Sequence, residues 1–245
     1  TGDQEAAPED YRHALRDVIS NCLYGVDINP MSAELCRVAL WMEAMEPGKA
    51  LAFLDHRIMV GNSLIGATPQ GLSGGIPDGA FKPIEGDDKK HCAVLKKANK
   101  QKREDRLKGQ SLFSFASGPE QDDLADKAKL VGASGGDSLE DQQRQAAQYG
   151  ALVGDPIWRQ RKLACDAWCA AFMWKKDGSE LAKKCPSDSD VQRILTEPDF
   201  REANPEQVTE IDRLATEYGF FHWHLAYPHV LAWHESPPVP AVANA

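Results

Sequence analysis

The chain has 245 residues, of which 42% are hydrophobic and 27% charged, as is usual for a globular protein of one or two domains. Its formal net charge of −9 disfavours nucleic-acid binding by the chain as a whole. It has no apolar run of membrane-spanning length, no signal peptide at its start and no C-x-x-C pair among its six cysteines, which predicts a cytoplasmic protein with reduced thiols.

The first part of the chain has the pattern of a helix, a strand and a second helix. Residues 8–20 have the spacing of an amphipathic helix, and residues 23–27 have the pattern of a short buried strand that ends on Asp27. Asn29 and Pro30 are suited to be the N-cap and first residue of the next helix. Apolar residues recur along that helix at helical spacing, and Gly48 is a plausible stop: Leu35, Val38, Met42 and Met45.

A second short strand is predicted at residues 57–60, followed by Gly61 and Asn62. Strand, helix and strand form one crossover unit of a parallel sheet, in which ligands bind outside the carboxyl ends of the strands. A carboxylate at Asp27 could accept hydrogen bonds from both hydroxyls of a ribose, because Asn29 is better placed to cap the helix. The Asn62 amide could reach a base, although on chemistry alone a local turn is the better interpretation.

In the rest of the chain, helical segments are predicted to alternate with irregular ones. Residues 67–87 have the composition of a long loop, and residues 88–108 are predicted to form a lysine-rich helix. Residues around 114–138 have the composition of a mobile acidic segment. Further helices are predicted at 155–174, 190–195 and 205–218, the last ending at Gly219, before a disordered tail at 236–245.

The lysine-rich helix at 88–108 could neutralise the phosphates of a duplex. Nearby acidic residues dilute the run and no aromatic residue interleaves with it, so a solvated helix face is the better interpretation. The DNA-binding residues are therefore left unassigned.

Metal binding and nucleophilic catalysis find no support in the sequence. Cysteines 165, 169 and 185 and histidines 222, 224, 229 and 234 fit no standard zinc spacing, and core cysteines are the better interpretation. No G-x-S-x-G occurs, and no serine or cysteine is paired with a base. We therefore predict no metal ligands and assign no catalytic residue.

Several blocks of the sequence, taken together and in order, resemble adenine-specific DNA methyltransferases, especially the large proteins of restriction–modification and phage-defence systems. They cover about a third of the chain on a rough reading. The blocks are Asn21–Met31, Glu34–Glu43, Phe53–His56, Gly61–Gly66 and Phe220–Pro228.

The resemblance implies an α/β fold with a Rossmann-like sheet, which binds S-adenosylmethionine and transfers its methyl group to adenine N6 in DNA. Asp27 would hold the ribose hydroxyls, Ile28 would pack on the adenine of the cofactor, and Asn62 would approach that adenine's edge. The target adenine would be flipped out of the duplex.

Two motifs of the family are missing from this sequence. No glycine-rich loop precedes the strand at residue 23, and the tail has Ser236-Pro237-Pro238-Val239 where the family has Asn/Asp-Pro-Pro-aromatic. We therefore expect a fragment with an incomplete Rossmann-like sheet and a large, mainly helical, partly disordered insertion, inactive alone.

The expected organisation has four parts. Residues 1–68 would form a partial cofactor-binding α/β unit, 69–150 a loop and basic-helix insertion, 151–235 a helical region leading towards the missing catalytic strand, and 236–245 the tail. One alternative is a non-catalytic scaffold that docks on polypeptides supplying the missing motifs. A nicotinamide-dependent oxidoreductase is the least favoured, because G-x-G-x-x-G is absent.

Overall fold

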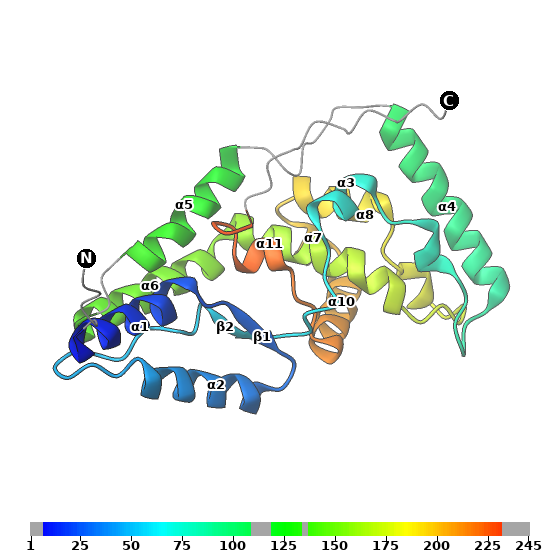
Figure 1. Ribbon diagram of the computed structural model, residues 1–245. Helices are drawn as coiled ribbons and strands as arrows, with labels where there is room; N and C mark the ends of the chain where they lie inside the picture. Colours follow the sequence, from blue (N-terminus) through cyan, green and yellow to red (C-terminus); the bar gives the residue numbers. More distant parts are fainter. Residues whose placement is uncertain (1–6, 109–118, 134–136, 232–245) are drawn as a thin grey trace, which may run out of the picture.

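The computed structural model describes residues 7–108, 119–133 and 137–231, and most of them are helical (Figure 1). The two strands are β1 (Gly25–Asp27) and β2 (Ile58–Val60). The helices, with 3-10 turns marked η, are α1 (Pro8–Cys22), α2 (Pro30–Glu43), α3 (Pro69–Gly74), η1 (Asp78–Phe81), α4 (Lys89–Lys108), α5 (Pro119–Ala133), α6 (Leu139–Gly154), α7 (Pro156–Met173), η2 (Ala182–Lys184), α8 (Asp188–Thr196), α9 (Phe200–Ala203), α10 (Pro205–Tyr218) and α11 (Trp223–Ala226).

The predicted Rossmann-like sheet is wrong. The described residues contain one sheet of two parallel strands, and the only further strand-like contact is a single parallel bridge between Asn62 and Phe220. After β2 the apolar residues of the chain recur at helical spacing, so the described segments that follow pack as helices and add no further strand. Local patterns identified β1 and β2 correctly, but the wider sheet was implied only by the resemblance.

The crossover unit β1–α2–β2 itself is confirmed. Asn29 caps α2 by accepting a hydrogen bond from the Met31 N–H at 2.9 Å, and Pro30 is the first helical residue. The helix ends at Glu43, one turn before the predicted stop at Gly48.

The apolar stripe of α2 is turned to solvent, although its spacing is that of a core face. Leu35 is 62% exposed and Met42 68%, whereas α2 buries Ala33 and Arg37 against the strands. The Arg37 guanidinium donates to the Ile58 carbonyl from Nε at 3.0 Å and from Nη2 at 2.6 Å. A two-stranded sheet covers only a narrow strip of a helix, so the rest of the apolar surface stays open.

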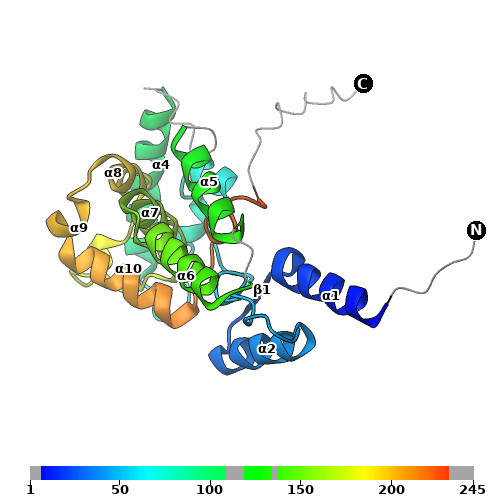
Figure 2. The same cartoon turned by 90° about the vertical axis from the view of Figure 1, so that its left-hand side faces the viewer.

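The main hydrophobic core surrounds α7, which runs through the middle of the molecule (Figures 1 and 2). Ala164, Ala167, Ala170 and Ala171 are fully buried, and these small side chains let α8 and α10 pack closely on α7. Trp174 closes the end of the helix, with its Nε1–H donating to the Leu181 carbonyl at 3.0 Å.

The region between β2 and α7 differs in part from its prediction. The basic helix is confirmed as α4, but α3 and η1 form where a loop was expected, and α5 forms within the segment expected to be mobile. The predicted tail at 236–245 lies outside the described residues. Among the residues described, no helix combines the length and apolarity that crossing a bilayer would require.

Candidate functional site

The carboxyl ends of β1 and β2 lie side by side. The strands are parallel, with Asp27 opposite Val60, and just beyond them the Gly61 N–H donates to the Asp27 carbonyl at 2.9 Å. Asp27 and Asn62 therefore stand at the same edge of the sheet. We call Asp27, Ile28, Asn62 and Leu64 the rim.

Asp27 is exposed, and its carboxylate has one described partner. Oδ1 accepts a hydrogen bond from the Asn29 N–H at 2.7 Å, which closes a tight turn before α2. Asn29 therefore caps the helix as predicted, but Asp27 also has a structural duty that the sequence interpretation assigned to Asn29 alone. No cation lies within ion-pairing distance of Asp27 among the described residues, so its remaining acceptor sites face solvent.

Asn62 forms the local turn that its chemistry favoured. Its Oδ1 accepts from the Leu64 N–H at 3.0 Å, and its own N–H donates to the Gly219 carbonyl at 2.6 Å. The backbone of Asn62 is thus held on both sides, by β1 through Gly61 and by the end of α10 through Gly219. The side-chain NH₂ has no described partner and is the group that remains available for a ligand.

Two apolar side chains flank these polar groups. Ile28 follows Asp27 and is 62% exposed, and Leu64 follows the Asn62 turn and is 91% exposed. Ile28 was predicted from the sequence as part of the site, whereas Leu64 was not. The available signal was an apolar residue placed two positions after Asn62, within the turn that the sequence predicted there.

The segment after α10 fixes the loop that carries Asn62. The Phe221 N–H donates to the Ile65 carbonyl at 2.8 Å, and Trp223 Nε1–H donates to the Ser63 carbonyl at 3.1 Å. The Tyr227 hydroxyl lies 2.7 Å from the Arg57 carbonyl, just before β2. This segment was expected to lead towards a catalytic strand. Within the described residues it contains the short helix α11 and braces the rim.

We compared the chain with protein-family models, curated proteins and solved structures. No match was found. The function of the chain is therefore inferred from the chemistry of its own residues.

A buried polar cluster beneath the rim connects α7 to the loop after β2. His222 Nε2 lies 2.8 Å from Oδ1 of Asp166, and His222 Nδ1 accepts from the Ala67 N–H at 3.0 Å. Because Nδ1 is an acceptor, the proton sits on Nε2 and the ring is neutral. Lys162 supplies the charge that balances Asp166, with Nζ 2.6 Å from Oδ2. Both ring nitrogens of His222 and both carboxylate oxygens of Asp166 therefore have a partner within the protein.

Three cysteines are buried in the C-terminal half of α7 and just after η2, namely Cys165, Cys169 and Cys185. Burial raises the pKa of the Cys169 and Cys185 thiols to about 12 and that of Cys165 well above its ordinary value, so all three stay protonated. Cys165 Sγ has a long contact of 3.9 Å with His224 Nε2. Cys165, Cys169 and Cys185 are buried, as core cysteines are. Among the described residues no group of His, Cys, Asp and Glu side chains could hold a metal ion.

Two cavities of the described region do not coincide with the rim. A small one of about 160 Å³ lies beside β2 and has mainly apolar and aromatic walls, including Val60, Tyr149, Trp158 and Phe221. This volume is below that of ordinary cofactor pockets.

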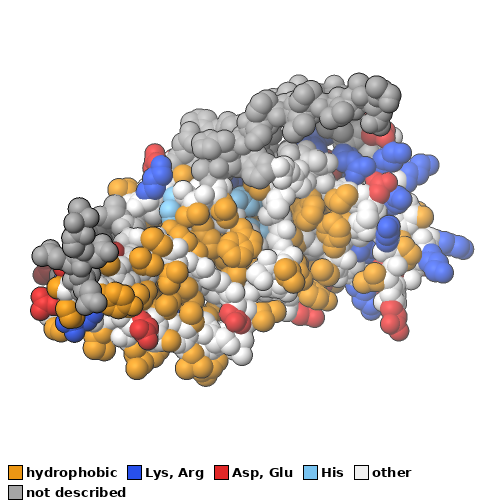
Figure 3. All heavy atoms as spheres, viewed as in Figure 1, with side chains coloured by type: hydrophobic (Ala, Val, Ile, Leu, Met, Phe, Trp, Pro, Cys, Tyr) orange, Lys and Arg blue, Asp and Glu red, His pale blue; other side chains and the backbone are white. Residues whose placement is uncertain are grey.

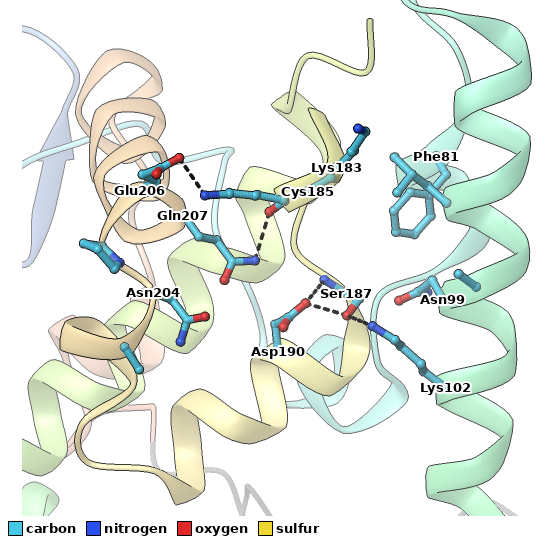
Figure 4. A pocket seen from close by; sticks show the side chains of 15 residues that line it. Phe81, Asn99, Lys102, Lys183, Cys185, Ser187, Asp190, Asn204, Glu206 and Gln207 are labelled. Carbon is cyan, nitrogen blue, oxygen red and sulfur yellow. Dashed lines mark hydrogen bonds and ion pairs between the residues drawn. The ribbon is translucent and has the colours of Figure 1, made fainter. Parts of the chain in front are cut away.

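A larger cavity of about 580 Å³ lies between α4, η2, α8 and α10 (Figure 4). Its charged side chains have partners within the protein: Lys184 pairs with Glu206 at 2.6 Å, and Asp190 accepts from the Ser187 hydroxyl at 2.5 Å. Lys102 donates to the same hydroxyl at 3.0 Å. No residue of β1, β2 or the rim lines this cavity.

Proposed function

We propose that this chain is a piece of an adenine-specific DNA methyltransferase of the restriction–modification or phage-defence type, and that its rim holds the adenosyl half of S-adenosylmethionine. One observation carries the proposal: an exposed carboxylate and a half-buried amide stand at the same edge of the sheet, at the carboxyl ends of paired parallel strands. This is the edge of a parallel sheet at which ligands bind.

The donor and acceptor inventory of the rim suits an adenosyl group. An ionised carboxylate has about four lone-pair sites, and Asn29 occupies one of those on Asp27, which leaves room for two ribose hydroxyls. The free NH₂ of Asn62 can donate to a ring nitrogen of adenine, and Ile28 offers an apolar surface to the ring. S-adenosylmethionine supplies the methyl group, and the rim residues bind and orient it.

We expect weak cofactor binding and no activity from this chain alone. The rim offers no backbone loop to the methionine half of the cofactor, because the sequence contains no glycine-rich loop before β1. The groups that would accept hydrogen bonds from the target amine and stack on the flipped base are absent from the tail motif.

Calorimetric titration with S-adenosylmethionine tests the proposal. We expect the wild-type chain to bind and Asp27→Ala to bind at least tenfold more weakly, a loss of about 1.4 kcal/mol or more. Asp17→Ala, which removes an exposed carboxylate of α1, is the matched control and should bind as wild type does. Equal binding by wild type and Asp27→Ala would remove Asp27 from the site, and no binding by the wild-type chain would remove the site itself.

A second candidate function, a docking piece for a separately encoded polypeptide, is favoured by the surface around α2. The stripe formed by Met31, Leu35, Val38 and Met42 is exposed along the whole helix, as the apolar area at the lower left of Figure 3 illustrates. Large exposed apolar patches mark interaction sites. In the described region β1 pairs only with β2, so its other edge is open to a further strand.

These two features together call for a partner that adds an extended strand at β1 and places apolar side chains on α2. Co-expression with a polypeptide carrying the glycine-rich loop and the Asn-Pro-Pro-aromatic motif tests this. We expect a complex that survives gel filtration with wild type and dissociates with Leu35→Glu/Met42→Glu. A complex unaffected by that variant, or no complex at all, would exclude this docking mode.

A further inference from the structure

We propose that the solvent face of α4 contacts the phosphates of duplex DNA. The inference rests on the proposed function, because the methyltransferase assignment is what makes DNA the relevant polyanion. It goes beyond that function by assigning a DNA contact surface to particular residues at the end of the molecule away from the rim (Figure 1).

Two groups of cations can be distinguished on α4, and the first group anchors the helix. Lys96 and Arg103 both pair with Asp78, at 3.5 and 2.9 Å, and Arg106 pairs with the buried Asp188 at 2.7 Å. These contacts fix α4 on η1 and α8. They also neutralise the positive charges on the side of α4 that faces the body of the protein.

The second group is directed to solvent. Lys89, Lys90 and Lys97 are exposed and have no carboxylate within 4.0 Å among the described residues, and Lys100 has only a long contact of 3.9 Å with Glu104. Lys90, Lys97 and Lys100 are separated by seven and three positions, which places them on one helix face. Figure 3 shows the resulting collection of basic side chains over α4 on a chain whose net charge is −9.

The spacing of these lysines suits a nucleic-acid backbone. Ten residues of helix separate Lys90 from Lys100, or about 15 Å at the helical rise of 1.5 Å per residue. One DNA strand has an axial rise of about 3.4 Å per nucleotide, so this face matches the length of about four phosphates. A row of point charges fixed on a rigid helix can therefore lie against the phosphates over this length of duplex.

The chemistry of this face favours contacts to the backbone only. It presents ammonium groups and carries no aromatic side chain that could stack on an unpaired base. Phosphate contacts position a protein on a duplex without reading its sequence. We therefore expect α4 to hold DNA that flanks the modified base, with no sequence preference of its own.

The test is fluorescence anisotropy with a labelled 25-base-pair duplex of arbitrary sequence, titrated with the full chain at 50 and 200 mM salt. The variant is Lys90→Gln/Lys97→Gln/Lys100→Gln, since glutamine keeps helix propensity while removing charge. The control is Lys129→Gln/Lys175→Gln/Lys183→Gln, which changes the net charge equally. Each control lysine is exposed but paired with a neighbouring acid, namely Asp126, Asp177 and Glu180.

We expect the α4 variant to bind DNA at least tenfold more weakly than wild type at 50 mM salt. The slope of log affinity against log salt should fall by about three, close to one unit for each phosphate that the variant no longer neutralises. The control should stay within twofold of wild type. Equal losses of affinity in both triple variants would mean that overall charge, and not the α4 face, determines DNA binding. An α4 variant that binds DNA as wild type does, or a wild-type chain that does not bind DNA, would also overturn the proposal.

Calorimetry with S-adenosylmethionine separates this proposal from the assigned function. The α4 variant should bind the cofactor as wild type does, because none of the three lysines lies on β1, β2 or the rim. Loss of DNA binding in the α4 variant, together with equal cofactor binding by wild type and Asp27→Ala, would support the surface and contradict the cofactor site. The reverse pattern would contradict the surface alone.

Discussion

His222 and Asp166 form a buried pair in which the imidazole Nε2–H donates to the carboxylate Oδ1 across 2.8 Å. The other ring nitrogen of His222 accepts from the Ala67 N–H, so one side chain joins α7, the loop after β2 and the segment after α10. Burial acts to raise the pKa of Asp166, but the hydrogen bond from His222 and the charge of Lys162 outweigh it and hold the pKa below its ordinary value. The carboxylate therefore stays ionised inside the protein, provided that both partners are present.

Replacing His222 by alanine should destabilise the fold. The substitution leaves the Ala67 N–H without its acceptor and Asp166 Oδ1 without its donor, while Lys162 still pairs with Oδ2. Leaving two buried polar groups unsatisfied costs about 2 kcal/mol or more. Urea denaturation followed by tryptophan fluorescence measures the change in the free energy of unfolding. His13→Ala is the control, because that side chain is 55% exposed and its ion pairs are solvated, so we expect a change within about 0.5 kcal/mol. Equal effects of the two substitutions would show that the buried pair contributes nothing.

Stability should also fall as the pH drops below 6.5, in part because of His56. Burial lowers the pKa of His56 from 6.5 to about 3, and the nearby charges of Arg57 and His229 act in the same direction. The unfolded chain takes up the proton near pH 6.5, whereas the folded chain takes it up only near pH 3. The stability that the neutral His56 side chain contributes is therefore fully present above pH 6.5. On acidification the free energy of unfolding falls by up to about 1.4 kcal/mol per pH unit.

The variant His56→Phe isolates this contribution. The His56 ring stacks on Phe53 at a centroid distance of 5.2 Å, and neither ring nitrogen has a described hydrogen-bond partner, so phenylalanine keeps the stacking and removes two unpaired polar atoms. We expect the variant to be at least as stable as wild type at pH 7. Between pH 6 and 5 the free energy of unfolding of the variant should fall by about 1.4 kcal/mol less than that of wild type. Urea denaturation at each pH measures this difference. Burial also lowers the pKa of His224 to about 3. Its contribution to the pH dependence of stability is present in both proteins and cancels in the comparison. Parallel pH curves would contradict the assignment to His56.

The parts of the fold that the sequence predicted are those set by local chemistry. Asn29 and Pro30 begin α2 because a side-chain acceptor and a fixed φ suit the first turn, and Gly219 ends α10 with a left-handed φ of 64°. These signals act over a few residues and need no knowledge of tertiary structure. The strands at Asp27 and Val60 were found in the same way.

The parts that failed depend on contacts between distant residues. Leu35 and Met42 have the spacing of a core face, but Arg37 satisfies the Ile58 carbonyl and turns the opposite side of α2 towards the strands. The Asn62 N–H donates to the Gly219 carbonyl, and no sequence pattern near either residue predicts that hydrogen bond. The breadth of the sheet was likewise invisible, because a single crossover unit does not determine how many strands join it.

Gly66 lies in the loop after β2, where the Phe221 backbone leaves no room for a side chain. A Cβ built on Gly66 would lie 1.9 Å from the Phe221 carbonyl oxygen, far inside any permitted contact. The neighbouring Ile65 carbonyl accepts from the Phe221 N–H at 2.8 Å, so the two backbones cannot separate without breaking a hydrogen bond. Gly66→Ala should therefore reduce the free energy of unfolding by about 2–3 kcal/mol, as forced overpacking does.

The matched control for Gly66 is Gly79→Ala in η1, where an added Cβ would meet nothing within 4 Å. We expect the control to unfold within about 0.5 kcal/mol of wild type in urea. Because residues 61–66 carry Asn62, a folded Gly66→Ala chain should also bind S-adenosylmethionine more weakly than the control does. A Gly66→Ala chain as stable as Gly79→Ala would mean that the loop and the Phe221 segment are not held in close contact. The brace that positions Asn62 beside Asp27 would then be absent.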